Sequence, residues 1–109
     1  AARIERGGLD EPDLARMIEG FVGAHAARVD ACVLGCTHYP FVRAQIERAL
    51  GPGVRFFDGG AGTARQLRAR LAAGGLLAER GRAGRVEFAS SLDTPDELAL
   101  YRRFFELPL

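Results

Sequence analysis

The sequence predicts an α/β fold in which a parallel sheet lies between helices, in a three-layer αβα arrangement. Two observations predict it. Segments with the 3.6-residue apolar period of a helix alternate along the 109 residues with short, continuous apolar runs. Continuous apolar runs are typical of strands covered on both faces, as the strands of parallel sheets are. Alternation of the two patterns is the sequence signature of βαβ units.

The first strong pattern is an amphipathic helix that the side chain of Asp10 can cap. Its stripe recurs with helical spacing at Leu14, Met17, Ile18, Phe21, Val22 and His25. Because His25 falls on this apolar face, we expect it to be a structural histidine with a hydrogen-bond partner. A buried strand over 31–34 follows and stops at Gly35, and Cys32 within that strand is expected in the core.

The middle of the chain predicts a second helix, a second strand and a third helix. The second helix begins at Pro40 and ends at residues 51–53, with an apolar face formed by Val42, Ile46, Ala49 and Leu50. Residues 54–57 predict the second strand, and a glycine-rich turn over 58–62 follows it. The third helix is expected over 63–73, with an apolar face formed by Ala64, Leu67 and Leu71.

The C-terminal part predicts a polar loop over 78–84, a third strand over 85–89 and a final helix. The helix start is well marked, because Thr94 can cap it, Pro95 suits the first helical position and Glu97 suits the third. The expected buried stripe of this helix consists of Leu98, Tyr101, Phe104 and Phe105.

Composition excludes several classes of protein. The chain is 48% hydrophobic and 27% charged, which is ordinary for a globular protein. Its net charge of +1 argues against a nucleic acid or a membrane surface as partner. No apolar run approaches the ~20 residues of a membrane-spanning helix, and the N-terminus lacks a signal-peptide pattern. We therefore expect a cytoplasmic protein with both cysteines reduced.

The predicted sheet is thin for an independent domain. Three strands with their helices bury only a modest area, and small domains bury a low fraction of their surface. The chain also begins at Ala1 rather than at methionine. We therefore expect a piece of a longer protein, whose remaining part would complete the sheet.

The segment with chemical potential is Leu34-Gly35-Cys36-Thr37-His38-Tyr39-Pro40, at the carboxyl end of the first predicted strand. Open α/β sheets place their ligand sites at this end. Backbone N–H groups, the dipole of the following helix and a protonated His38 would all favour the thiolate of Cys36. Gly35 would allow a tight turn and close approach of a ligand, and Thr37 offers a hydroxyl and an N–H to a carboxylate. The spacing alone leaves an alternative equally open, in which Cys36 is a small buried residue and His38 a hydrogen-bonded turn residue.

A metal site is not expected. Cys32 and Cys36 would be separated by ~13 Å on an extended strand, which is too far for one metal ion or a disulfide.

The cysteine segment resembles the second cysteine motif of glutamate racemases, a family within the aspartate/glutamate racemase superfamily. Ile4-Glu5-Arg6-Gly7 resembles the upstream segment that supplies an active-site glutamate, which would be Glu5. Residues 54–64 resemble the family's strand and D-S-G-x-x-T-A turn, although Gly59 stands where the serine is usual. The capped final helix resembles the C-terminus of the family, so the resemblance covers nearly the whole chain.

This resemblance implies racemisation of L-glutamate to D-glutamate for peptidoglycan biosynthesis, without pyridoxal phosphate, metal or other cofactor. Two cysteines on opposite faces of the substrate α-carbon would exchange its proton. Cys36 would be the second of these thiols, and His38 would tune its proton affinity. Glu5 would orient the substrate or the thiol–histidine pair, while Thr37 and Gly35 would contact the substrate.

The resemblance also implies two pseudo-symmetric α/β domains with the active site between them. Residues 1–58 would end the second domain, and residues 59–109 would cross over and return to the first. The first catalytic cysteine has no counterpart here, so we expect the chain to be inactive alone; a homodimer is one arrangement open to the full-length parent. Two alternatives remain: an aspartate or hydantoin racemase of the same superfamily, and a non-catalytic remnant or binding module that retains an amino-acid pocket or a protein partner.

Overall fold

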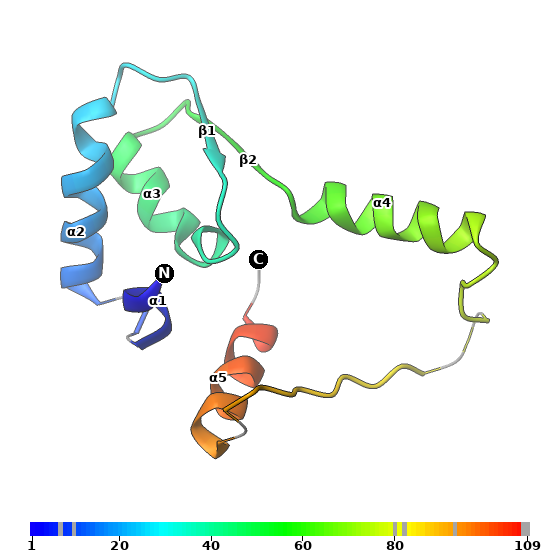
Figure 1. Ribbon diagram of the computed structural model, residues 1–109. Helices are drawn as coiled ribbons and strands as arrows, with labels where there is room; N and C mark the ends of the chain where they lie inside the picture. Colours follow the sequence, from blue (N-terminus) through cyan, green and yellow to red (C-terminus); the bar gives the residue numbers. More distant parts are fainter. Residues whose placement is uncertain (7, 10, 80, 82, 93, 108–109) are drawn as a thin grey trace. The chain divides into compact units, whose positions relative to one another are not determined.

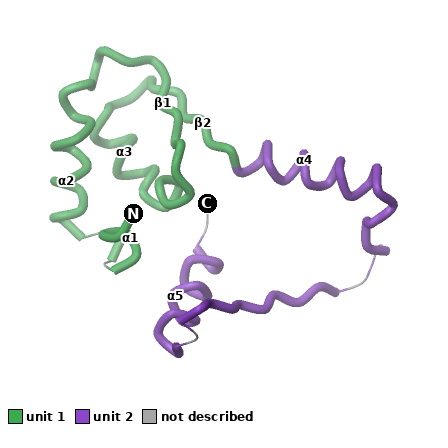
Figure 2. Tube along the Cα trace, in the orientation of Figure 1, with its two compact units in different colours: residues 1–59, 109 green, residues 60–108 purple. Residues whose placement is uncertain are grey.

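The computed structural model describes residues 1–6, 8–9, 11–79, 81, 83–92 and 94–107. It divides the chain into two compact units, residues 1–59 and residues 60–108 (Figure 2). Unit 1 contains most of the regular structure and all of the predicted site residues, and each unit is described by itself below.

Unit 1 has helices and strands in alternating order (Figure 1). Its elements are α1 (Ala2–Arg6), α2 (Pro12–Val22), the 3-10 turn η1 (Gly23–His25), β1 (Ala31–Leu34), the 3-10 turn η2 (Tyr39–Val42), α3 (Arg43–Leu50) and β2 (Arg55–Asp58). The strands β1 and β2 pair in parallel, with Ala31 opposite Arg55 and Leu34 opposite Asp58. The α/β class and the parallel pairing of the first two strands are therefore confirmed.

The core of unit 1 joins the helices to β1. Its buried apolar side chains come from α1, α2, β1, η2 and α3 and are Ile4, Leu14, Ile18, Leu34, Val42, Ile46 and Leu50. Two pairs, Leu14 with Ile18 and Ile46 with Leu50, are four residues apart and so lie on one face of their helix. Removal of this apolar surface from water is the main force that holds unit 1 together.

The apolar stripe predicted for α2 is only partly buried. Leu14 and Ile18 are in the core, whereas Met17 and Phe21 are 40% and 73% exposed. Both of these line a cavity of about 410 Å³ that is bounded mainly by apolar side chains of α1, α2 and β1. Half-buried Cys32 also lines this cavity, so its predicted place in a closed core is wrong.

The ends of α2 differ from prediction. Asp10, the predicted cap, lies outside the described residues; Glu11 occupies the N-cap position without a side-chain cap bond, and Pro12 is the first helical residue. At the other end, His25 belongs to the 3-10 turn η1 and is exposed. The prediction of a buried structural histidine is therefore wrong, because the α-helix ends at Val22 and the face on which His25 would lie does not continue.

Unit 2 contains α4 (Gly60–Ala73) and α5 (Pro95–Glu106). The helix α4 begins at Gly60 rather than at Thr63 and so takes up most of the predicted glycine-rich turn. Residues 85–89 form no strand, and the sheet of the described residues has two strands rather than three. Instead, Phe88 packs edge-on against Phe105, with ring centroids 5.6 Å apart.

The start of α5 is confirmed as predicted. Pro95 is at the beginning of the helix, and the hydroxyl of Thr94 accepts a hydrogen bond from the backbone N–H of Glu97. None of the helices in the described part of the chain is long and apolar enough to cross a membrane.

Candidate active site

The strand β1 carries the cysteine segment out of the core. Leu34 is buried, and the chain turns directly after it, with the Gly35 N–H donating to the Val33 carbonyl at 3.1 Å. The backbone N–H of Tyr39 then donates to the Cys36 carbonyl, which closes the turn that leads into η2. Two backbone hydrogen bonds thus fix the loop that presents Cys36, Thr37 and His38.

Two details of the predicted loop are wrong. The helix expected to begin at Pro40 begins at Arg43, because the 3-10 turn η2 intervenes. The α-helix therefore starts seven residues after Cys36 in sequence, with η2 between Cys36 and its first turn. Gly35 is absent from the described glycines with positive φ, so the turn does not require its conformational freedom. Apart from its two chain neighbours, no described residue has an atom within 4 Å of where a Cβ of Gly35 would be, which leaves open space at this point of the loop.

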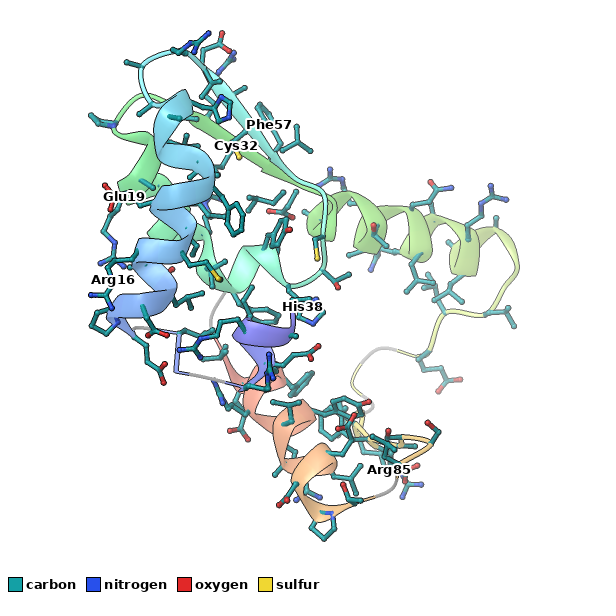
Figure 3. The ribbon with its side chains drawn as sticks, turned by 60° about the vertical axis from the view of Figure 1, so that its left-hand side comes forward. Arg16, Glu19, Cys32, His38, Phe57 and Arg85 are labelled. Carbon is teal, nitrogen blue, oxygen red and sulfur yellow. The ribbon has the colours of Figure 1, made fainter. Side chains whose placement is uncertain are left out.

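His38 is the centre of a polar cluster. Its Nε2 lies 2.6 Å from Oε1 of Glu5, a residue of α1 that is 33 positions away in sequence. Its Nδ1 lies 3.7 Å from Sγ of Cys36 and 3.4 Å from Oγ1 of Thr37. The structure thus brings together four of the five predicted site residues, and Figure 3 shows His38 beside α1.

The cluster changes the proton affinities of its members. The backbone N–H and then the ring of His38 hold the pKa of Cys36 below its ordinary value of 9.0, while partial burial opposes them. In turn, Cys36 and then Glu5 raise the pKa of His38 above 6.5. A thiolate–imidazolium pair is the charge state that this geometry favours.

Two neighbours of Glu5 in α1, Arg3 and Ile4, hold this helix in place. The guanidinium of Arg3 pairs with Glu11 and, at 2.6 Å, with Asp13, which ties α1 to the start of α2. Between Arg3 and Glu5, Ile4 is buried in the core with 4% of its surface exposed. The partner of His38 therefore sits on an anchored segment and not on a free terminus.

The sequence analysis overlooked Gln45. Its side chain is buried, and Nε2 donates to the backbone carbonyl of Leu9 at 2.6 Å. A signal was present, because Gln45 lies three residues after Val42 and one before Ile46, on the face expected to be apolar. A polar residue at such a position indicates a specific hydrogen bond.

Cys32 has no part in the cluster. It lines the 410 Å³ cavity, and both Cys32 and Cys36 are free thiols. Within the described ranges, no group of three or more His, Cys, Asp or Glu side chains could hold a metal ion.

Several known proteins have sequences similar to that of this chain. No protein-family model matches the chain. Glutamate racemase of Pseudomonas putida is 45% identical over 91 residues, which are 83% of this chain and 34% of that protein. Glutamate racemase of Clostridium perfringens is 32% identical over 105 residues, which are 95% of this chain and 40% of that protein. The chain is similar to glutamate racemases.

The similarity covers most of this chain but only a minor part of each relative. A third glutamate racemase, from Herpetosiphon aurantiacus, is 43% identical over 81 residues, 74% of this chain and 32% of that protein. The resemblance predicted from residues 34–40 is therefore confirmed for most of the chain. This chain spans only about a third to two fifths of the length of these relatives.

Proposed function

We propose that the chain supplies one of the two thiols of a glutamate racemase that works without cofactor. The observation that supports this proposal is the line of contacts from Glu5 through His38 to Cys36, within a chain similar to glutamate racemases. A lowered thiol pKa is what a base acting near neutral pH needs. The product, D-glutamate, would serve peptidoglycan biosynthesis in the cytoplasm.

Cys36 acts as base toward one enantiomer and as acid toward the other. The thiolate takes the α-proton, an S–H bond forms, and the electron pair of the C–H bond stays on carbon as a carbanion. A second thiol, from the part of the enzyme outside this chain, delivers a proton to the opposite face and becomes the thiolate. Because the α-proton is weakly acidic, exclusion of water and stabilisation of the carbanion must contribute.

The other loop residues contact the substrate. The hydroxyl of exposed Thr37 is available to a substrate carboxylate beside His38. The open space at Gly35 admits the substrate close to the backbone, whereas its N–H already donates to Val33. Glu5 keeps the ring of His38 oriented toward Cys36 through the opposite ring nitrogen.

The active enzyme needs more protein than this chain. In the proposed arrangement, residues 1–58 end the second of two α/β domains, and residues 59–109 cross over and return to the first. Each complete domain is a three-layer αβα structure, and the full-length parent can form a homodimer. Since the first thiol is outside this chain, we expect the chain alone to invert neither enantiomer.

Proton NMR of L- and D-glutamate in deuterated water tests the proposal, with aspartate as the control substrate. The purified chain should produce no inversion, and any loss of the glutamate α-proton signal should vanish in Cys36→Ala. Addition of the remaining part of the enzyme should restore exchange with inversion. Inversion by the chain alone would refute the assignment of one thiol per part, and exchange of aspartate but not glutamate would make it an aspartate racemase.

A further inference from the structure

The helix that carries Glu5 cannot hold its own position. With five residues, α1 is far below the length of about 12–15 residues at which an isolated helix becomes marginally stable. The position of α1 must therefore be fixed by tertiary contacts. The Arg3 ion pairs tie α1 to the start of α2, but they leave open how this segment is held against the loop that carries His38.

Gln45 makes a contact between α3 and the segment that follows α1. Its Nε2 donates to the Leu9 carbonyl, and the residue is only 6% exposed. Its Oε1 is buried and has no hydrogen-bond partner among the residues that the structure describes. A buried acceptor without a partner is unfavourable, so an apolar side chain of the same size would suit the stability of this position as well or better.

Two hydrogen bonds therefore join the N-terminal segment that contains Glu5 and Leu9 to the segment that contains His38 and Gln45. Glu5 meets His38 across 33 residues, and Leu9 meets Gln45 across 36 residues. Between His38 and Gln45 the chain is continuous through η2 into α3, without an intervening loop. A fixed distance between Leu9 and Gln45 consequently restricts where Glu5 can lie relative to His38.

We infer that Gln45 is a positioning residue, which holds Leu9 beside α3 so that the carboxylate of Glu5 reaches the ring of His38. It touches neither Cys36 nor His38 in any described contact and acts through Glu5. The inference rests on the proposed function, because it concerns the orientation of the same thiol–histidine pair.

The test compares the reactivity of Cys36 toward iodoacetamide as a function of pH in the full chain, with Cys32→Ser as background so that one thiol reports. Gln45→Met removes the donor at nearly constant volume, Glu5→Gln removes the carboxylate, and Ile46→Val is the matched control in the same core. Glu5 is one of the groups that raise the pKa of His38, so either loss weakens the imidazolium and raises the pKa of Cys36.

We expect Gln45→Met to slow alkylation near pH 7 by about three- to tenfold, since one pKa unit changes the thiolate fraction tenfold. The shift in the Cys36 pKa caused by Gln45→Met should not exceed the shift caused by Glu5→Gln. The double variant should match Glu5→Gln alone, because both substitutions act through one contact. Ile46→Val should lower stability without moving the pH profile. These readouts separate positioning from a merely structural role.

The outcomes distinguish the two proposals. A depressed Cys36 pKa that Glu5→Gln shifts but Gln45→Met leaves unchanged would overturn the role of Gln45 and leave the proposed function intact. An ordinary Cys36 pKa near 9.0 in the unsubstituted chain would overturn both. If Gln45→Met does not fold, proton NMR of the unsubstituted chain decides: nuclear Overhauser contacts between the Gln45 amide protons and the Leu9 α-proton support the inference, and their absence overturns it.

Discussion

The two units differ in how their helices are stabilised. In unit 1, all three α-helices and β1 contribute buried apolar side chains to one core. In unit 2, neither α4 nor α5 has a buried residue, although α4 is the longest described helix, with 14 residues. Helix stability in proteins comes mainly from packing of an apolar face. Unit 1 can therefore position a site by its own core, whereas the helices of unit 2 depend on local interactions or on surfaces that the unit does not itself provide.

The sharpest test of this difference replaces one leucine in each unit. Leu14 is 1% exposed and Leu67 is 58% exposed. We expect Leu14→Ala to lower the free energy of unfolding of unit 1 by about 2–5 kcal/mol, because it leaves a cavity in the core. Leu67→Ala in unit 2 should change the free energy of unfolding of that unit by less than about 0.5 kcal/mol. Urea unfolding followed by circular dichroism measures both.

Two results would contradict this difference between the units. Equal losses from Leu14→Ala and Leu67→Ala would show that α4 is covered as well as the core of unit 1. A negligible loss from Leu14→Ala would show that the core around α2 and α3 does not determine stability. The conservative variant Leu14→Met keeps most of the volume and should cost less than about 1.5 kcal/mol.

The contrast also explains which elements the sequence could predict. The apolar period identified α2 and α3, and capping signals identified the start of α5, because those signals are local to each helix. They could not show whether an apolar face is covered. Leu67 lies on the face predicted for α4, yet no residue of α4 is buried. Residues 85–89 have a strand-like pattern, but a strand exists only when a second strand pairs with it, and the described residues supply none.

The candidate site shows the same division. The proximity of Cys36 and His38 could be predicted from residues 34–40, since residues two apart in a tight loop must lie close together. The contact of Glu5 with His38 joins positions 33 residues apart, and only the resemblance to a family indicated it. Gln45 escaped notice because its partner is a backbone carbonyl, which no side-chain pattern reveals.

A second prediction concerns the cap of α5. The hydroxyl of Thr94 accepts from the Glu97 N–H at 3.3 Å. Thr94→Ala should destabilise the start of this helix by about 1 kcal/mol. Because unit 2 lacks buried helical residues, we expect the loss as faster hydrogen exchange within α5 alone. Hydrogen exchange followed by mass spectrometry would resolve it.

The matched control for this variant is Ser90→Ala, which removes a hydroxyl that accepts from the Leu92 N–H outside any helix. It should leave the exchange of α5 unchanged. If Thr94→Ala also accelerated exchange in α2 and α3, the stability of the two units would be coupled, and the comparison drawn above would fail.

The smallest expected effect is a pH dependence confined to unit 1. Cys36 and then Glu5 raise the pKa of His38 above its ordinary value of 6.5. A group whose pKa is raised by folding contributes stability that is complete below its unfolded pKa and is lost as the pH rises through its folded pKa. Glu5→Gln should therefore cost more stability at about pH 5.5 than at about pH 9, because the ring loses its proton as the pH rises.

The magnitude is limited by solvent, because the side chains of His38 and Glu5 are 27% and 41% exposed. Glu19→Gln removes an exposed carboxylate from α2 and serves as the control for a change of net charge. Urea unfolding at the two pH values measures the difference between the variants. A cost of Glu5→Gln that is larger at the higher pH would mean that its carboxylate acts on a neutral partner, so the thiolate–imidazolium pair would lose its structural basis. A cost that declines as the ring loses its proton would instead tie the stability of unit 1 to the charge state that the proposed chemistry requires.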